Sequence, residues 1–129
     1  MEEHFDAFAR GPANFVALSP ISFLNRAAEV YAPETAVVYG DIRRTWADTA
    51  RRIRGMAAGL MAMGVGKGTT VAVLAPNIPE LFELHFAVPM TGGVLCTINT
   101  RLEADTVAYI PAHSDATVDI VDTGLQPLL

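Results

Sequence analysis

Apolar residues recur at helical spacing near the start of the chain, after an irregular lead-in over residues 1–18. Ser19 and Pro20 mark the start of a helix, because serine caps a helix and proline fits its first turn. We expect this helix to stop before Pro33. A small β-hairpin follows, with strands at residues 36–39 and 42–45. The apolar face of the helix consists of Phe23, Leu24, Ala27, Ala28 and Tyr31.

The clearest helical pattern begins at Thr45 or Trp46, where Thr45 and Asp48 form an approximate capping pair. Gly64 is expected to end this helix as a left-handed residue. One face carries Ala50, Ile53, Ala57, Leu60 and Gly64, and the opposite face carries Arg51, Arg54 and Ala58. The pattern therefore predicts an amphipathic helix with one buried side.

Apolar strands then alternate with helices through the rest of the chain. Strands are predicted at residues 71–75, 94–98 and 117–121, and helices at residues 80–90 and 103–113. Pro89 and Pro111 fall late in these helices, so we expect a kink or an early stop near each. Short apolar strands separated by helices are typical of a parallel sheet with right-handed crossovers. The sequence therefore predicts an α/β fold, with the hairpin and a βαβαβ parallel sheet with flanking helices in a single module over residues 1–129.

The charge of the chain limits its partners. A net charge of −5 argues against nucleic acid, which selects basic surfaces. The basic run of Arg43, Arg44, Arg51, Arg52 and Arg54 is interpreted as a solvated helix face. Residues 71–100 carry only two charges, Glu80 and Glu83, but prolines and glycines divide the stretch, and a membrane span needs ~20 continuous apolar residues. We therefore expect no membrane span.

The single cysteine, Cys96, excludes an internal disulfide and favours a reducing compartment. The acidic N-terminus lacks the apolar core of a signal peptide. Together these observations predict a cytoplasmic protein.

The glycine-rich segment 64–70 resembles a phosphate-binding loop in composition only. Such a loop follows a strand and opens a helix, so that helix N–H groups meet the phosphate. This segment closes a helix and enters a strand, and Gly68 stands where the motif needs serine or threonine. We interpret it as a helix exit.

Three polar residues are candidates for a substrate pocket or for structural roles. Asn99 and Arg101 follow a predicted strand, and ligands of open α/β sheets bind beyond the carboxyl ends of strands. Asn99 equally fits a turn. His85 lies on an apolar helix, where a lone histidine is more often a hydrogen-bonded core residue than a ligand contact. Pro76 and Asn77 follow another strand and share the positional argument.

No residue is assigned a catalytic, cofactor-binding or metal-binding role. His85 has no carboxylate placed by the sequence to orient it as a base. Cys96 lies in an apolar strand and lacks the electropositive setting of a nucleophile. No cluster of histidine, cysteine and aspartate has the spacing of metal ligands.

Several segments resemble the adenylate-forming, or AMP-binding, superfamily. They are residues 18–28, 45–46, 71–80, 85–95 and 99–102, so that the similarity runs from about residue 14 to residue 122. Each motif is weak alone, but their order and spacing are specific. The combination is similar to acyl-CoA synthetases, in particular the short- and medium-chain acyl-CoA ligases, the plant acyl-activating enzymes and the methylmercaptopropionate–CoA ligases.

The resemblance implies the opening part of the large N-terminal domain of such an enzyme. In the family, a carboxylic acid and ATP form an acyl-adenylate and pyrophosphate with Mg²⁺ present, and coenzyme A then displaces AMP. The family's phosphate loop, its adenine- and ribose-binding motifs and its C-terminal catalytic lysine have no match in this chain. We therefore expect ATP, Mg²⁺ and coenzyme A to serve the full-length enzyme, with none bound by this chain alone, which should be inactive.

Two alternatives to an enzyme segment stay open at this point. A truncated relative of the family could act as a stand-alone interaction module that self-associates through the open edge of its sheet. A small flavodoxin-like nucleotide binder is supported only by the βαβαβ order, which is an analogy of fold.

Overall fold

A computed structural model describes residues 9–126 of the chain. Residues 9–18 contain a turn but no helix or strand, in agreement with the expected lead-in, whose first eight residues lie outside the described part. Helix α1 (Pro20–Val30) begins as predicted, with the Ile21 N–H donating to Ser19 Oγ at 3.2 Å. No helix in the described part is long and apolar enough to cross a membrane.

The hairpin and the long helix after it agree closely with the sequence pattern. Strands β1 (Thr35–Tyr39) and β2 (Ile42–Thr45) pair antiparallel, and α2 (Trp46–Ala62) follows directly. The Asp48 N–H donates to Thr45 Oγ1 at 3.1 Å, which caps α2. At the other end Gly64 has φ of +88°, and the Val65 N–H donates to Leu60 O at 3.0 Å. These contacts form the expected left-handed helix stop.

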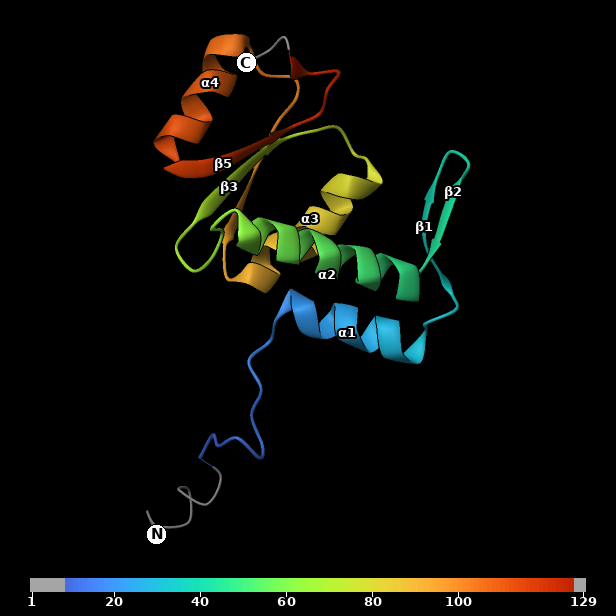
Figure 1. The fold of residues 1–129 in the computed structure, drawn as a ribbon. Helices are drawn as coiled ribbons and strands as arrows, with labels where there is room; N and C mark the ends of the chain where they lie inside the picture. The colour runs from blue at the N-terminus through green and yellow to red at the C-terminus, as the bar shows by residue number, and fades with distance from the viewer. Residues whose placement is uncertain (1–8, 127–129) are drawn as a thin grey trace.

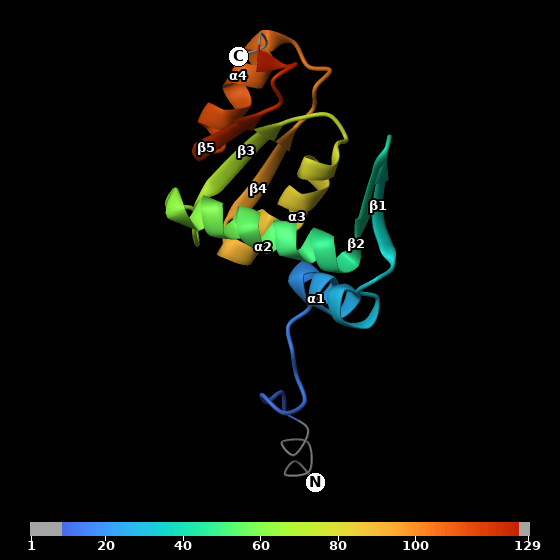
Figure 2. The ribbon, with the colours of Figure 1, turned by 45° about the vertical axis from the view of Figure 1, so that its right-hand side comes forward.

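Three parallel strands form the central sheet, in the order β4-β3-β5 (Figures 1 and 2). Their bounds are β3 (Thr70–Leu74), β4 (Val94–Ile98) and β5 (Ala116–Val121), and the crossover helices are α3 (Pro79–Thr91) and α4 (Ala104–His113). Each of these elements lies within one residue of its predicted bounds. Helix α3 ends two residues after Pro89, and α4 ends two residues after Pro111, so both helices stop close to their prolines.

Strand β3 is buried on both faces and separates two hydrophobic cores. Val71 and Val73 pack into a core formed with α1, α2 and α3. Ala72 and Leu74 pack into a smaller core beneath α4, together with Ile98. Because side chains of a strand alternate between faces, four consecutive apolar residues from Val71 to Leu74 fit between two helical layers. The α/β fold predicted from the sequence is confirmed.

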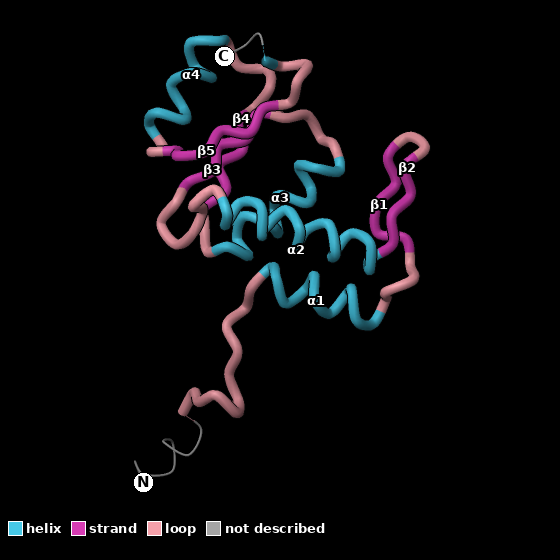
Figure 3. Tube along the Cα trace, in the orientation of Figure 1, coloured by secondary structure: helices cyan, strands magenta, loops and turns pink. Residues whose placement is uncertain are grey.

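The hairpin stands apart from the sheet, beside the N-terminal end of α2 (Figure 3). Its base is tied by the Trp46 N–H, which donates to Glu34 O, and by the Ala47 N–H, which donates to Ala32 O, both at 3.0 Å. Val38 and Tyr39 near its tip are largely exposed. The hairpin therefore receives little support from the hydrophobic cores.

Candidate functional site: two adjoining clefts

A polar cleft of about 470 Å³ lies where β3 and β4 end. It brings together the three candidates from the sequence, His85, Asn99 and Arg101, with Asn77 from the loop after β3. The remaining lining residues are Ala75, Leu81, Thr97, Ile98 and Thr100. The carboxyl ends of neighbouring parallel strands meet at one edge of a sheet, which explains why residues distant in sequence share this cleft.

Arg101 carries the only permanent charge among the residues that line the polar cleft, because no aspartate or glutamate is among them. The Arg101 backbone N–H donates to Asn99 Oδ1 at 3.0 Å. This contact closes a turn at Asn99 and leaves the side-chain amide NH₂ group of Asn99 as a donor. With the guanidinium of Arg101 and the hydroxyl of Thr100, the cleft is rich in hydrogen-bond donors, which suits an anionic group.

His85 is exposed on the surface of α3, so its interpretation as a core histidine is wrong. The helix buries Leu84, Ala87 and Val88, whereas His85 falls on the opposite side, which faces both clefts. Its Nδ1 lies 2.8 Å from Leu81 O. Because a carbonyl oxygen only accepts, Nδ1 carries the proton and Nε2 stays available for another partner.

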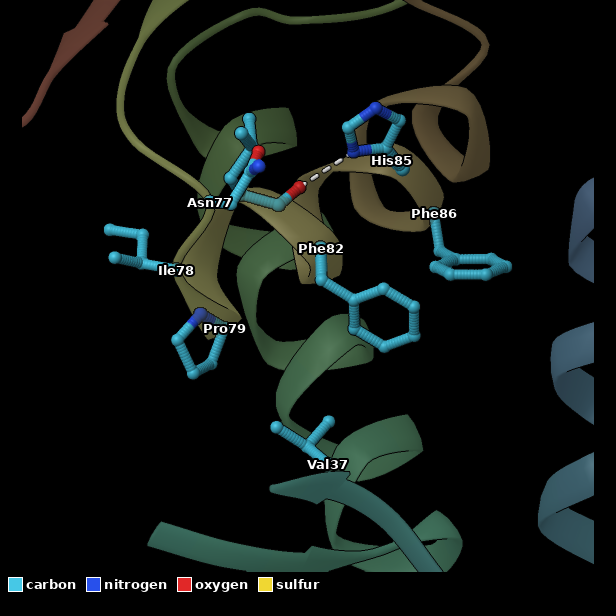
Figure 4. A pocket seen from close by; sticks show the side chains of 8 residues that line it. Val37, Asn77, Ile78, Pro79, Phe82, His85 and Phe86 are labelled. Atoms are coloured by element: carbon cyan, nitrogen blue, oxygen red, sulfur yellow. Dashed lines mark hydrogen bonds between the residues drawn. The ribbon is translucent and has the colours of Figure 1, made fainter. Parts of the chain in front are cut away.

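A second, apolar cleft of about 520 Å³ adjoins the polar one, between the hairpin and α3 (Figure 4). Its apolar wall consists of Val37, Ile78, Pro79, Leu81, Phe82 and Phe86. Phe82 and Phe86 pack edge to face, with ring centroids 5.4 Å apart. The two clefts share Asn77, Leu81 and His85, so His85 stands at the boundary between an apolar and a donor-rich surface.

Two arginines of the basic run form an ion cluster with a buried glutamate, so the interpretation of the whole run as a solvated face is wrong. The side chain of Glu83 on α3 is completely buried, and its Oε1 accepts from Arg52 Nε at 2.6 Å and from Arg44 Nη1 at 2.8 Å. The contact with Glu83 is the largest cause that raises the pKa of Arg52. The sequence contained a signal for this cluster, since Glu83 is a charge inside an apolar helix, and a buried charge needs a partner.

The other residues considered in the sequence have structural positions. The glycine-rich segment 64–70 connects the end of α2 to the start of β3, as its order predicts. Cys96 is half-buried in β4. Neither lines one of the two clefts.

The described residues do not fit a Mg²⁺–ATP site. Residues 9–126 contain no group of three or more histidine, cysteine, aspartate or glutamate side chains that could hold a metal ion. The loop from β3 into α3 is Ala75-Pro76-Asn77-Ile78, without the glycines that let a backbone approach phosphates closely. We therefore derive no reaction step through ATP or Mg²⁺ from this segment.

Comparisons with known proteins agree with this fold. Residues 24–128 match the family model of the AMP-binding enzymes. The chain is 45% identical over 117 residues to a peroxisomal butyrate–CoA ligase of Arabidopsis thaliana, which covers 91% of this chain and 20% of the ligase. It is 44% identical over 117 residues to the peroxisomal trans-cinnamate:CoA ligase of Petunia hybrida, again covering 91% of this chain and 20% of the relative.

Solved structures give the same result. The N-terminal domain of FACL13 from Mycobacterium tuberculosis superimposes with a TM-score of 0.81 at 32% identity, covering 86% of this chain and 29% of that one. The anthranilate CoA ligase AuaEII in complex with anthranoyl-AMP gives a TM-score of 0.84 at 25% identity, covering 91% and 23% of the two chains.

The chain therefore belongs to the AMP-binding enzyme family. It spans about a fifth of the length of the CoA ligases that it matches. It corresponds to an N-terminal segment, as the resemblance implied.

Proposed function

We propose that the protein to which this chain belongs is an acyl-CoA synthetase, which joins a carboxylic acid to coenzyme A at the expense of ATP. The observation that carries this proposal is the 45% identity to a butyrate–CoA ligase over 91% of the chain. The relatives named as CoA ligases act on short-chain and aromatic acids. The reaction of the whole protein therefore needs ATP, Mg²⁺, coenzyme A and a carboxylic acid, whereas the chain alone is inactive.

The polar cleft contributes a wall that binds an anionic part of a substrate. Its support is the donor set of Arg101, Asn99 and Thr100, with no carboxylate among the lining residues to repel an anion. Both the carboxylate of the acid and the phosphates of the nucleotide substrates have the required chemistry.

A chimera tests the function without requiring the rest of the parent protein. Residues 9–126 replace the corresponding segment of the Arabidopsis butyrate–CoA ligase, and formation of butyryl-CoA is measured. We expect a folded chimera that forms the thioester, because the segment supplies the same fold at 45% identity. A chimera that folds and forms no thioester, beside an active parent ligase, would contradict the proposal.

The same chimera tests the role of the polar cleft. Arg101→Gln removes the charge, and Arg51→Gln, at an exposed position on α2, is the matched control. Because hydrogen bonds to charged groups contribute about 1.5–3 kcal/mol, we expect about a tenfold or greater rise in KM for one substrate with Arg101→Gln. Comparing KM for butyrate with KM for ATP and for coenzyme A identifies which anion the cleft binds. No change in any KM would exclude the cleft as a binding wall.

Two further properties of the protein remain predictions. We propose a cytoplasmic location on the grounds of the single cysteine in this chain, although some relatives are named peroxisomal. Within residues 9–126, β4 and β5 pair with no further strand on their outer sides, and we expect the chain to self-associate through this open edge. Light scattering on the purified chain tests it.

A further inference from the structure

The ion cluster around Glu83 joins side chains from three consecutive elements of the chain, of which β2 leads directly into α2 and α2 packs on α3. Arg44 comes from β2, Arg52 from α2 and Glu83 from α3. Both arginines donate to the same oxygen, Glu83 Oε1, and the glutamate side chain is completely buried whereas that of Arg44 keeps 16% of its surface exposed. A carboxylate removed from water in this way is stable only while its partners remain in place.

Glu80, one turn earlier on α3, completes the balance of charge. Its Oε1 lies 3.5 Å from Arg44 Nη2 and 3.6 Å from Arg52 Nη2. Each arginine therefore reaches both carboxylates, and the cluster holds two positive and two negative charges. A neutral cluster of this kind orients its members without leaving a net charge in the interior.

The hairpin has few other connections to α3. Within residues 9–126, the hydrogen bonds that link the hairpin to α3 are those from Arg44 to Glu83 and to Glu80. The apolar side chains of Val38 and Tyr39 are exposed and contribute little burial. The base of the hairpin is fixed by backbone hydrogen bonds and by contacts with α2, and its hydrogen bonds to α3 come from the side chain of Arg44.

The apolar cleft lies between these two elements. Val37 of β1 forms one side of it, and Phe82 and Phe86 of α3 form the other (Figure 4). Glu83 follows Phe82 directly in the sequence, but its side chain is buried and does not line the cleft. The ion cluster thus links the two elements that form the walls of the cleft without itself entering the cleft.

We propose that Glu83 is a positioning residue, which clamps the hairpin to α3 through Arg44 and so sets the opening of the apolar cleft. The clamp is distinct from the proposed anion-binding wall, because neither Glu83 nor Arg44 lines the polar cleft. Loss of the clamp releases the hairpin about its base and separates Val37 from the phenylalanine pair.

Hydrogen exchange of the purified chain tests the clamp. Arg44→Met keeps the length and apolar stem of the side chain and removes its charge, and Arg51→Met, 76% exposed and paired only with Asp48, is the control. We expect amide exchange in β1 and β2 to be about tenfold faster in Arg44→Met, with exchange in β3 unchanged, because the hairpin opens locally. Arg44→Lys, which keeps the positive charge, should restore part of the protection.

A second measurement separates the clamp from a general loss of stability. In labelled protein, the chemical shifts of the Val37 methyl groups and of the Phe82 and Phe86 ring protons report on the cleft that these residues line. We expect these chemical shifts to change in Arg44→Met and in Glu83→Gln, and to stay the same in Arg51→Met. Unchanged hairpin exchange with unchanged chemical shifts would overturn the proposal, and so would equal acceleration of exchange in the hairpin and in β3.

Discussion

The central sheet and the junction between hairpin and α3 are stabilised in opposite ways. Strand β3 is buried between two hydrophobic cores, and every side chain from Val71 to Leu74 is apolar. The junction instead joins its elements through two arginines and two glutamates. Apolar burial is non-directional and tolerates small shifts, whereas an ion cluster fixes a particular geometry. The sheet therefore supplies most of the stability, and the junction supplies the shape of the apolar cleft.

The largest effect is expected in the sheet. Leu74→Ala removes a fully buried side chain from the core beneath α4 and should lower the free energy of unfolding by about 3 kcal/mol. Met61→Ala, on the exposed face of α2, is the control and should change it by less than about 0.5 kcal/mol. Urea unfolding measures both. Equal effects would show that the smaller core does not stabilise the sheet.

A smaller loss is expected at the junction. Glu83→Ala removes the central carboxylate and should lower the free energy of unfolding by about 2 kcal/mol. This is less than the 3–5 kcal/mol typical of a broken buried ion pair. The reduction follows from the partial exposure of Arg44 and Arg52, which can turn to water. Glu80→Ala is the matched control, since Glu80 is half exposed and lies farther from both arginines. If Glu80→Ala lowered the free energy of unfolding as much as Glu83→Ala, the burial of Glu83 would not explain the stability of the junction.

The start of α2 connects the junction to the helical layer. A substitution there should lower the free energy of unfolding by less than one at Glu83. Thr45→Ala removes the hydroxyl that accepts from the Asp48 N–H, so we expect a loss of about 1 kcal/mol. Thr45→Ser keeps the hydroxyl and should retain most of the stability. Thermal unfolding distinguishes the two variants, and a Thr45→Ala protein as stable as the parent would exclude the cap as a significant contribution.

The smallest expected effect is a dependence of the folding stability on pH, which arises at the same end of α2. The hydrogen bond from the Thr45 hydroxyl, followed by the contacts with Arg51, lowers the pKa of Asp48 below 3.8. A carboxyl group with a lowered folded-state pKa stabilises the fold above its unfolded pKa, and this stabilisation is lost as the pH falls through the folded value. Asp48→Asn should therefore flatten the stability profile below about pH 4. An unchanged acid profile would contradict this assignment.

The difference between the two regions also explains what the sequence could predict. Strand β3 follows from a run of apolar residues, and the ends of α2 follow from Thr45 and Gly64, because these signals are local. The polar cleft could also be predicted from the sequence, since Asn99 and Arg101 closely follow the end of a strand. Residues with local signals were therefore placed correctly.

The errors concern residues whose environment depends on packing between distant segments. The apolar neighbours of His85 in the sequence favour a core position. In the folded chain, α3 packs its other side against the core, so the side chain of His85 is exposed. Arg44 and Arg52 look like surface charges until α3 brings Glu83 between them, 39 and 31 residues away in the sequence. The apolar cleft is not evident from the sequence for the same reason, because Val37 and Phe82 come to line one cleft only in the folded chain.

Carboxylate-dependent exchange of pyrophosphate into ATP by the purified chain is the most direct test of the central claim. The claim is that this segment provides the fold and part of a substrate wall, while the phosphate loop and the catalytic groups come from elsewhere in an acyl-CoA synthetase. We predict no exchange above background with butyrate or any other acid. Exchange well above background by the pure 129-residue chain would contradict the claim.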